Sequence, residues 1–201
     1  MKRIITILCM FLFLNVHSQE ESNKTNPAKG HNHFFVSVGS YSGIFTRNAF
    51  TPMPNSTSVH NIGFGVYYEY YSSDSWSIKT GLTYDPKGRT STILDADYKL
   101  RYLTLPVLAS WHFGEKRRWY LNFGLYLGFL VSSNLSDLGL SGLLKDYDSG
   151  FDLGVGIRIP VGSHMFYVEL DRQTGAVNPS KSGISSGLML SRTALSVGYI
   201  F

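Results

Sequence analysis

Residues 119–131 carry the pattern that decides the fold, and their sequence is WYLNFGLYLGFLV. Large apolar residues occupy every odd position from Trp119 to Val131, whereas the small or polar residues Asn122, Gly124 and Gly128 all fall at even positions. Alternation with period two is typical of a β-strand whose two faces meet different surroundings. Strands of soluble proteins typically have ~5–6 residues, and a tilted membrane-spanning strand needs ~9–11. The length therefore favours a strand that crosses a membrane.

The same alternation recurs along the chain and predicts eight strands, at residues 33–43, 61–71, 76–85, 98–113, 119–132, 151–161, 164–174 and 191–201. Long polar connections are expected at 44–60, 86–97, 133–150 and 175–190. Short connections are expected at 72–75, 114–118 and 162–163. The last is a Gly-Ser pair, which is a hairpin signal. Long and short connections that alternate in this way predict an up-and-down meander with all short turns at one end.

The two faces of these strands differ in charge. The runs of large apolar residues on one face, such as Leu103 to Phe113, contain no charged residue, and the opposite face carries Glu69, Lys79, Asp85, Asp152, Arg158, Glu169 and Asp171 together with the strand glycines. An eight-stranded barrel has an interior just wide enough for side chains, so small and polar residues belong inside. The large apolar face then points outward, where lipid can cover it. The sequence thus predicts an all-β fold: an eight-stranded antiparallel up-and-down transmembrane β-barrel over residues 33–201.

Outward-facing aromatic residues concentrate near the short-turn ends of the predicted strands. All three tryptophans, Trp76, Trp111 and Trp119, fall there. Tryptophan and tyrosine are enriched where a membrane meets water. We therefore predict one interfacial aromatic girdle at this end of the barrel.

The N-terminal region has the organisation of a secretory signal peptide. Lys2 and Arg3 precede the apolar run 4–16, and Ser18 provides a small residue at the expected cleavage site. We predict a signal peptide over 1–18 and a disordered lead-in over 19–32. The only cysteine, Cys9, lies within the apolar run, so the mature chain can form no disulfide framework and contains no catalytic thiol.

The charged residues do not indicate nucleic-acid binding or a known catalytic motif. The chain has 18 Lys+Arg and 14 Asp+Glu, and its cations are scattered except for the run 116–118, whereas a nucleic-acid footprint is clustered on one face. No hydrolase, metalloprotease or phosphate-loop motif occurs. His31 and His33 have the spacing of a metal-binding pair, but no further ligands lie nearby. We predict no catalytic residue, metal site or cofactor.

Polar residues on the lumen face form a second candidate feature, the polar cluster Glu69, Lys79, Arg158 and Glu169. A short turn at 72–75 sets Glu69 opposite Lys79. Pairing of Val161 with His164 would place Arg158 opposite Tyr167, with Glu169 on the diagonal. We interpret the cluster as a structural plug of ion pairs; a proton or ion path is the alternative. A porin is disfavoured, because eight strands leave no aqueous channel.

Two prolines need an explanation in a closed barrel, because proline cannot donate to a strand ladder. Pro160 lies beside the 162–163 hairpin, where its cost is small. Pro106 lies in mid-strand, and we expect a β-bulge there.

Three segments together resemble the PorT-like outer-membrane β-barrel domain family. These are Tyr102 to Leu108 (YLTLPVL), Phe123 to Leu130 (FGLYLGFL) and Asp152 to Gly156 (DLGVG). The resemblance covers essentially the mature chain and implies an outer-membrane barrel, but no precise activity. The family's namesake assists a secretion system.

The end of the chain resembles the closing-strand signal of outer-membrane proteins, with Leu195, Val197, Tyr199 and Phe201 on one face. The barrel-assembly machinery would recognise such a strand by pairing with an exposed edge.

The expected function is that of an integral outer-membrane barrel with a side-chain-filled lumen, acting as an envelope structural component or binding through its loops. The expected partners are outer-membrane lipid, an envelope protein and, during biogenesis, the barrel-assembly machinery and periplasmic chaperones. Two alternatives stay open: an accessory subunit of a secretion or uptake complex, and a soluble periplasmic barrel that carries a ligand. Nucleic acid is not an expected partner.

Overall fold

The computed structural model describes residues 29–47, 51–52, 56–91, 96–134, 144–181 and 189–201. The predicted signal peptide, 1–18, and most of the lead-in lie outside these residues. Nine strands are present: β1 (Asn32–Thr46), β2 (Ser56–Thr57), β3 (Val59–Tyr71), β4 (Trp76–Ser91), β5 (Ala96–Phe113), β6 (Trp119–Ser133), β7 (Tyr147–Val161), β8 (His164–Gly175) and β9 (Met189–Ile200). Within the described residues, no helix is long and apolar enough to cross a membrane.

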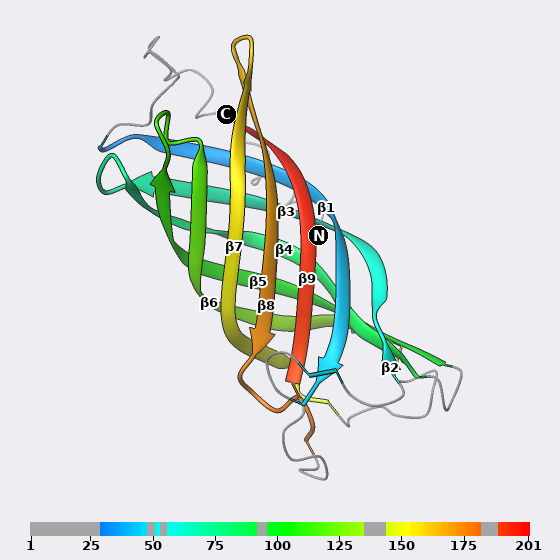
Figure 1. Ribbon diagram of the computed structural model, residues 1–201. Coiled ribbons are helices and arrows are strands. Elements are labelled where there is room, and N and C mark those ends of the chain that lie inside the picture. The colour runs from blue at the N-terminus through cyan, green and yellow to red at the C-terminus, as the bar shows by residue number, and fades with distance from the viewer. Residues whose placement is uncertain (1–28, 48–50, 53–55, 92–95, 135–143, 182–188) are drawn as a thin grey trace, which may run out of the picture.

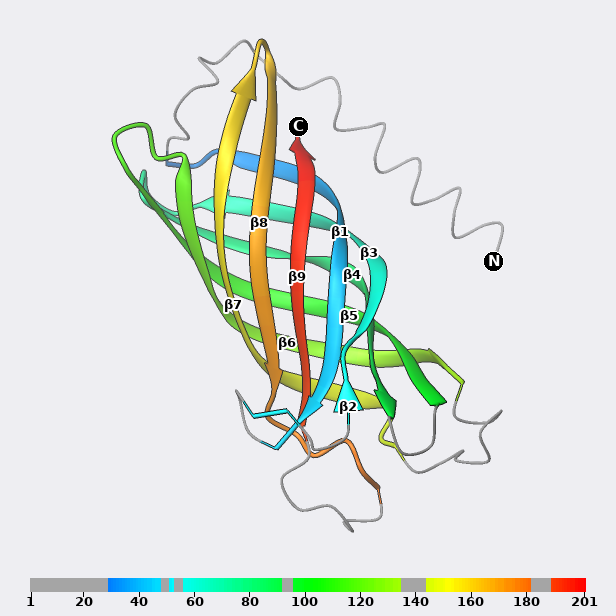
Figure 2. The same ribbon diagram turned by 45° about the vertical axis from the view of Figure 1, so that its right-hand side comes forward.

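Eight of these strands pair in a closed ring, and the resulting barrel is seen in Figures 1 and 2. The long strands pair antiparallel with their neighbours in sequence, and β1 pairs with β9 from Phe35↔Ile200 to Thr46↔Met189. The two-residue β2 only adds to the far end of β4. The predicted eight-stranded antiparallel up-and-down barrel is thereby confirmed. We call its two ends the short-turn end, where β9 also finishes, and the long-loop end.

One predicted loop is wrong, because most of 86–97 is strand. β4 and β5 stay paired from Pro86↔Arg101 to Ser91↔Ala96, and β7 begins at Tyr147 rather than at residue 151. The apolar alternation marks only the part of a strand that faces an apolar medium. Backbone pairing does not need apolar side chains, so the ladder continues through polar sequence beyond it.

The expected bulge at Pro106 is also wrong. Pro106 pairs in register with Tyr126, and the β4–β5 register is the same on both sides of it, from Thr80↔Val107 to Thr83↔Thr104. Thr80 Oγ1 donates a hydrogen bond to the Pro106 carbonyl (2.8 Å), so a side chain bridges the point where the proline has no N–H to donate. The irregularity in this region lies instead between Arg101 and Tyr102.

Pro160 lies where its missing N–H is harmless. β7 pairs with β6 only as far as Ile157↔Trp119, while its pairing with β8 continues to Val161↔His164. The end of β7 is thus a free edge in the projecting β7–β8 hairpin (Figure 2). Proline on a free edge blocks unwanted strand addition there.

The burial pattern confirms the two predicted faces. None of the residues assigned to the apolar face is buried, and all seven charged residues assigned to the opposite face are. The soluble carrier alternative fails here, because its apolar residues would line the lumen. Tyrosines fill much of the interior, a feature that the sequence reasoning missed: Tyr41, Tyr71, Tyr98, Tyr102, Tyr120, Tyr126 and Tyr167 are all buried.

Lumen tyrosines explain why glycines occupy the same face. Tyr120 pairs directly with Gly156 across β6 and β7, and a Cβ on Gly156 would overlap the Tyr120 ring. Tyr167 and Gly198 repeat the arrangement on β8 and β9. Each large ring needs a neighbour without a side chain, because interiors are close-packed.

Candidate functional site

The lumen brings the four predicted polar residues together, but in different pairs from those that strand neighbours alone suggest. Glu69 is opposite Lys79, and Arg158 is opposite Tyr167, as the register predicted. However, Arg158 Nη2 reaches Glu69 Oε2 (2.6 Å), and Lys79 Nζ reaches Glu169 Oε2 (2.7 Å). Each of these ion pairs joins strands that are not adjacent in the barrel wall. The cations therefore cross the lumen instead of pairing with neighbours.

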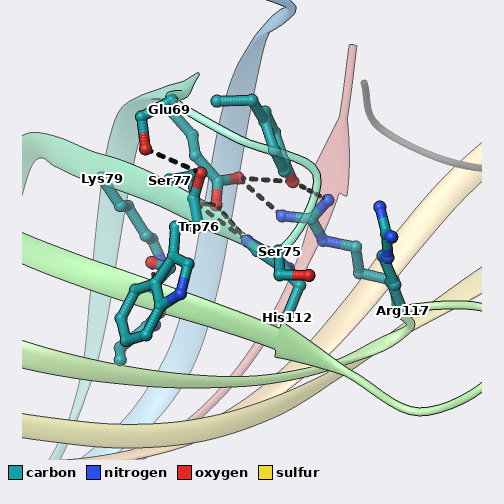
Figure 3. A network of polar contacts seen from close by, with 12 residues as sticks. Glu69, Ser75, Trp76, Ser77, Lys79, His112 and Arg117 are labelled. Carbon is teal, nitrogen blue, oxygen red and sulfur yellow. Dashed lines mark hydrogen bonds and ion pairs between the residues drawn. The ribbon is translucent and has the colours of Figure 1, made fainter. Parts of the chain in front are cut away.

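The Glu69 cluster consists of Glu69, Tyr71, Ser77, His112 and Arg158, near the short-turn end. Figure 3 labels Glu69, Ser77 and His112 of this cluster. Glu69 Oε1 accepts a hydrogen bond from Ser77 Oγ and lies 3.0 Å from His112 Nε2. Glu69 Oε2 accepts from Arg158 and from the Tyr71 hydroxyl (3.4 Å), and Arg158 Nη1 also donates to that hydroxyl. Both carboxylate oxygens are thus bonded, as a buried charge requires.

Ser77, His112 and Glu69 are the residue types of a hydrolytic triad, but their geometry differs from one. In a triad, the two histidine nitrogens divide the work: one accepts the serine proton and the other donates to the acid. Here His112 Nε2 contacts both Ser77 Oγ (2.8 Å) and Glu69 Oε1 (3.0 Å), and Ser77 donates directly to Glu69. All three side chains are buried. The carboxylate therefore does not orient the histidine through its second ring nitrogen, as the acid of a triad does.

Lys79 lies in a cage of aromatic rings. Its Nζ is 4.5 Å from the ring centroid of Tyr67 and 5.6 Å from that of Tyr167. Phe35 and Tyr120 complete the cage, at 5.7 and 5.8 Å. Cation–π contacts of this kind stabilise an ammonium group that has left water. The same aromatic rings therefore fill the lumen and stabilise the Lys79–Glu169 ion pair.

A second group, the Arg192 cluster, was not recognised from the sequence. It consists of Asp85, Asp152, Asp171, Gln173 and Arg192, farther toward the long-loop end. Arg192 Nη2 lies 2.8 Å from Asp171 Oδ2, and its Nε lies 3.7 Å from Asp85 Oδ1. Gln173 Nε2 donates to Asp152 Oδ2 (2.9 Å). Arg192 occupies an even position in a strand whose odd positions face lipid, so the same alternation would have placed it in the lumen.

A third ion pair lies beyond the Arg192 cluster, in sequence predicted as loop. Lys87 Nζ donates to Asp148 Oδ2 (2.8 Å), which also accepts from the Tyr126 hydroxyl (2.9 Å). An apolar cluster is buried at the same end of the barrel: Phe45, Tyr98, Leu100, Tyr102 and Leu190. Another apolar cluster, including Phe35, Tyr120, Tyr167 and Ile200, lies toward the short-turn end. Side chains therefore fill the lumen near both ends as well as in the middle.

The remaining predicted residues lie on the outer surface. Trp76, Trp111 and Trp119 are exposed, and Trp76 stacks on its partner Trp111 with ring centroids 6.4 Å apart. Leu195, Val197 and Phe201 are exposed, and Tyr199 packs edge-on against Phe166 and Phe201. Recognition of these four residues by assembly machinery stays a prediction.

Metal binding finds no support in the described ranges, where no group of three or more histidine, cysteine or acidic side chains is placed to hold an ion. His33 packs edge-on against Tyr71, with centroids 5.5 Å apart.

A closed antiparallel barrel with an apolar outer face and a charged, side-chain-filled lumen defines the class of outer-membrane β-barrels. The chain belongs to the outer membrane protein β-barrel domain family, whose model matches residues 18–179. No curated protein matches the chain.

Solved outer-membrane barrels are similar to this chain at low identity. OprG from Pseudomonas aeruginosa is 14% identical with a TM-score of 0.48, over 87% of this chain and 98% of that one. Ail, the attachment invasion locus protein of Yersinia pestis, is 13% identical with a TM-score of 0.47, over 86% and 99%. Outer membrane protein W of E. coli is 19% identical with a TM-score of 0.47, over 87% and 99%.

Proposed function

We propose that this outer-membrane protein is a closed barrel that acts as an envelope structural component or binds partners through its long loops. The observation that carries the proposal is the filled lumen. Three ion pairs that cross it, Arg158–Glu69, Lys79–Glu169 and Lys87–Asp148, occupy the space that a channel would need. Transport through the interior is therefore disfavoured, and the loops are the parts of the molecule with room to vary.

The proposed topology follows from the family and from the barrel rules. Outer-membrane barrels have short periplasmic turns and longer external loops, so we place the short-turn end in the periplasm. A signal peptide over 1–18, cleaved after Ser18, would deliver the chain there. Periplasmic chaperones and the barrel-assembly machinery would then insert it, with the face of Leu195, Val197, Tyr199 and Phe201 as the recognition signal.

We further propose that the protein is not an enzyme and uses no metal or cofactor. The geometry of Ser77, His112 and Glu69 supports the first part, because one histidine nitrogen contacts both partners. Its burial in the lumen supports the same conclusion, because a substrate would need access to the serine.

A role as an accessory subunit of a secretion or uptake complex is the second candidate. The resemblance of residues 102–108, 123–130 and 152–156 to the PorT-like family supports it. In that role the barrel would still be closed, and its partner would be another envelope protein.

Two measurements test the proposal. Planar-bilayer recordings of the refolded full chain should show no steady conductance; a stable open channel would overturn the closed lumen.

Pull-down from solubilised envelopes should recover an envelope protein with the wild type but not with a variant in which residues 135–143 are replaced by a short Gly-Ser linker. Replacement of the short turn 72–75 is the matched control. Retention of the partner by the loop variant would contradict loop-mediated binding.

A further inference from the structure

The outer surface of β5 changes character toward the long-loop end. Leu103, Leu105 and Val107 face outward, and the next two outward positions are Arg101 and Lys99, both exposed. The apolar run on this face of the strand, from Leu103 to Phe113, carries no charge, so these two cations mark its boundary. An outward cation is costly at the middle of a bilayer and cheap near its surface.

The depth of Arg101 can be estimated from Trp111, which faces outward on the same strand near the short-turn end. The two residues are ten positions apart. A rise of ~3.4 Å per residue and a tilt of ~45° separate them by about 24 Å along the membrane normal. The apolar band of such barrels is ~25 Å tall. If Trp111 marks the inner edge of the hydrocarbon, Arg101 lies at its outer edge, level with the lipid headgroups.

A third cation lies nearby, just before β7. The Nζ of Lys145 is 5.9 Å from the ring centroid of Tyr147, which is exposed and pairs with exposed Phe129 on β6. This aromatic pair lies at the long-loop end of β6 and β7, where aromatic residues mark the second interface of a membrane barrel. The Lys145 ammonium is therefore on the outer surface, at the edge of the apolar band.

The strand register places Lys145 beside the β5 cations. Arg101 pairs with Ser132 on β6, and Leu130 of β6 donates to the carbonyl of Asp146, the residue that follows Lys145. Lys145 is thus two strands away from Arg101, about 10 Å at the usual strand spacing. Long, flexible side chains can close that distance around one anion.

Local charge in this sector is positive. Asp146 adjoins Lys145, but its carboxylate lies 3.3 Å from the Nζ of Lys181. In β5, in the segment before β7 and at position 181, as far as the structure describes them, cations outnumber carboxylates, with Lys99, Arg101, Lys145 and Lys181 against Asp97 and Asp146. A surface at this depth faces lipid headgroups, so the complementary anion belongs to a lipid.

We propose that Lys99, Arg101 and Lys145 form a binding site for the phosphate groups of an outer-leaflet glycolipid of the lipid A type. The planar fork of Arg101 suits bidentate contact with phosphate, and the two lysines supply point charges on either side. Tyr147 and Phe129 lie beneath, against the first methylenes of the acyl chains. This inference rests on the proposed topology, which places the long-loop end outside.

Titration of the refolded full chain with diphosphorylated lipid A, followed by native mass spectrometry, tests the site. The variant Lys99→Gln/Arg101→Gln/Lys145→Gln should bind on the order of 100-fold more weakly than the wild type, since each surface cation contributes to attraction for anionic lipid. The matched control is Lys116→Gln/Arg117→Gln/Arg118→Gln at the short-turn end, which removes the same charge and should stay within about twofold of the wild type. Dephosphorylated lipid A should bind all three proteins weakly.

Heat-modifiable gel migration shows whether each variant is a folded barrel. If the triple variant is not, the single variant Arg101→Gln takes its place, with an expected loss of about fivefold. Unchanged binding by a folded variant, or an equal loss in the short-turn control, would overturn the site. Channel conductance by the wild type would overturn the closed lumen instead and leave the lipid result intact, so the two failures are distinguishable.

Discussion

The Glu69 cluster and the Arg192 cluster share one lumen, but they differ in how completely their polar atoms are bonded. Both oxygens of Glu69 accept hydrogen bonds from the protein. Neither oxygen of Asp85 accepts one from the described part of the chain, and Arg192 Nη1 likewise donates none. The difference lies in the carboxylates Glu69 and Asp85, because Arg158 Nε and His112 Nδ1 of the Glu69 cluster also have no hydrogen-bond partner within the described residues.

The Glu69 cluster and the Arg192 cluster also differ in the balance between cations and carboxylates. Around the Glu69 cluster, the carboxylates of Glu69 and Glu169 meet the cations Arg158 and Lys79 one to one. In the Arg192 cluster, Asp85 and Asp171 contact a single guanidinium, and the third carboxylate, Asp152, is bonded to Gln173 instead. Removing one partner of a buried ion pair is strongly destabilising, because it leaves an uncompensated buried charge. Arg192, in contrast, keeps Asp171 as a close partner when Asp85 is removed. We therefore expect the Glu69 cluster to contribute more to the stability of the barrel than the Arg192 cluster.

The largest expected effect comes from Glu69→Gln. The substitution keeps the side-chain shape but leaves the buried Arg158 guanidinium without a counter-charge, which should lower the free energy of unfolding by about 3–5 kcal/mol. Urea titration in lipid vesicles, followed by tryptophan fluorescence, measures it. Glu69→Gln combined with Arg158→Met should recover part of the loss, because no unpaired charge is left. A loss below about 1 kcal/mol in the single variant would remove the basis of the comparison.

Two glycine substitutions, with expected effects of intermediate size, test whether the two regions of the lumen are packed equally tightly. Gly156→Ala places a methyl group against the Tyr120 ring, beside Arg158 and Lys79, and should cost about 1–3 kcal/mol, as overpacking does. Gly128→Ala, toward the long-loop end, is the matched control, since the nearest atom is the Thr104 hydroxyl at 3.2 Å. The control should cost less in the same urea titration. Equal costs would show that both regions are packed equally tightly.

The smallest expected effect is that of Asp85→Asn. Asp85 contacts Arg192 only at 3.7 Å, and Arg192 keeps its closer partner Asp171 at 2.8 Å. Removing one carboxylate from a group of three also reduces their repulsion, so the free energy of unfolding should change by less than about 1 kcal/mol. A loss as large as that of Glu69→Gln would mean that the two clusters stabilise the barrel equally.

Sequence patterns predicted the part of the fold that meets lipid. Alternating residues such as those at 119–131 located all eight strands and assigned Glu69 and Arg158 to the lumen. The same reasoning failed beyond the membrane, where β4 continues to Ser91 without an apolar face. It also failed at Pro106, because a hydrogen bond from Thr80 on the neighbouring strand replaces the expected bulge.

The polar residues of the lumen were also only partly predictable from the alternation of the sequence. His112 occupies an even position in β5, so the alternation places it in the lumen. Its contacts with Glu69 and Ser77 were not predicted, because those two residues are far from it in the sequence. Lys87 lies in sequence that carries no alternation at all. The register predicted Tyr167 opposite Arg158, but aromatic residues were expected mainly in the outer girdle, so the pairs Tyr120–Gly156 and Tyr167–Gly198 were not predicted.

The amino-acid sequence by itself determined that this chain forms a closed membrane barrel, which face of each strand meets lipid, and the register of Glu69 with Lys79. Only the tertiary structure decided that Lys79 binds Glu169 and that Glu69 binds Arg158. Register fixes neighbours along adjacent strands, because backbone hydrogen bonds act locally. Pairing across the lumen depends on closure of the barrel, because closure brings strands that are not adjacent in the sheet to opposite sides of a narrow interior. Their side chains then contact each other across it.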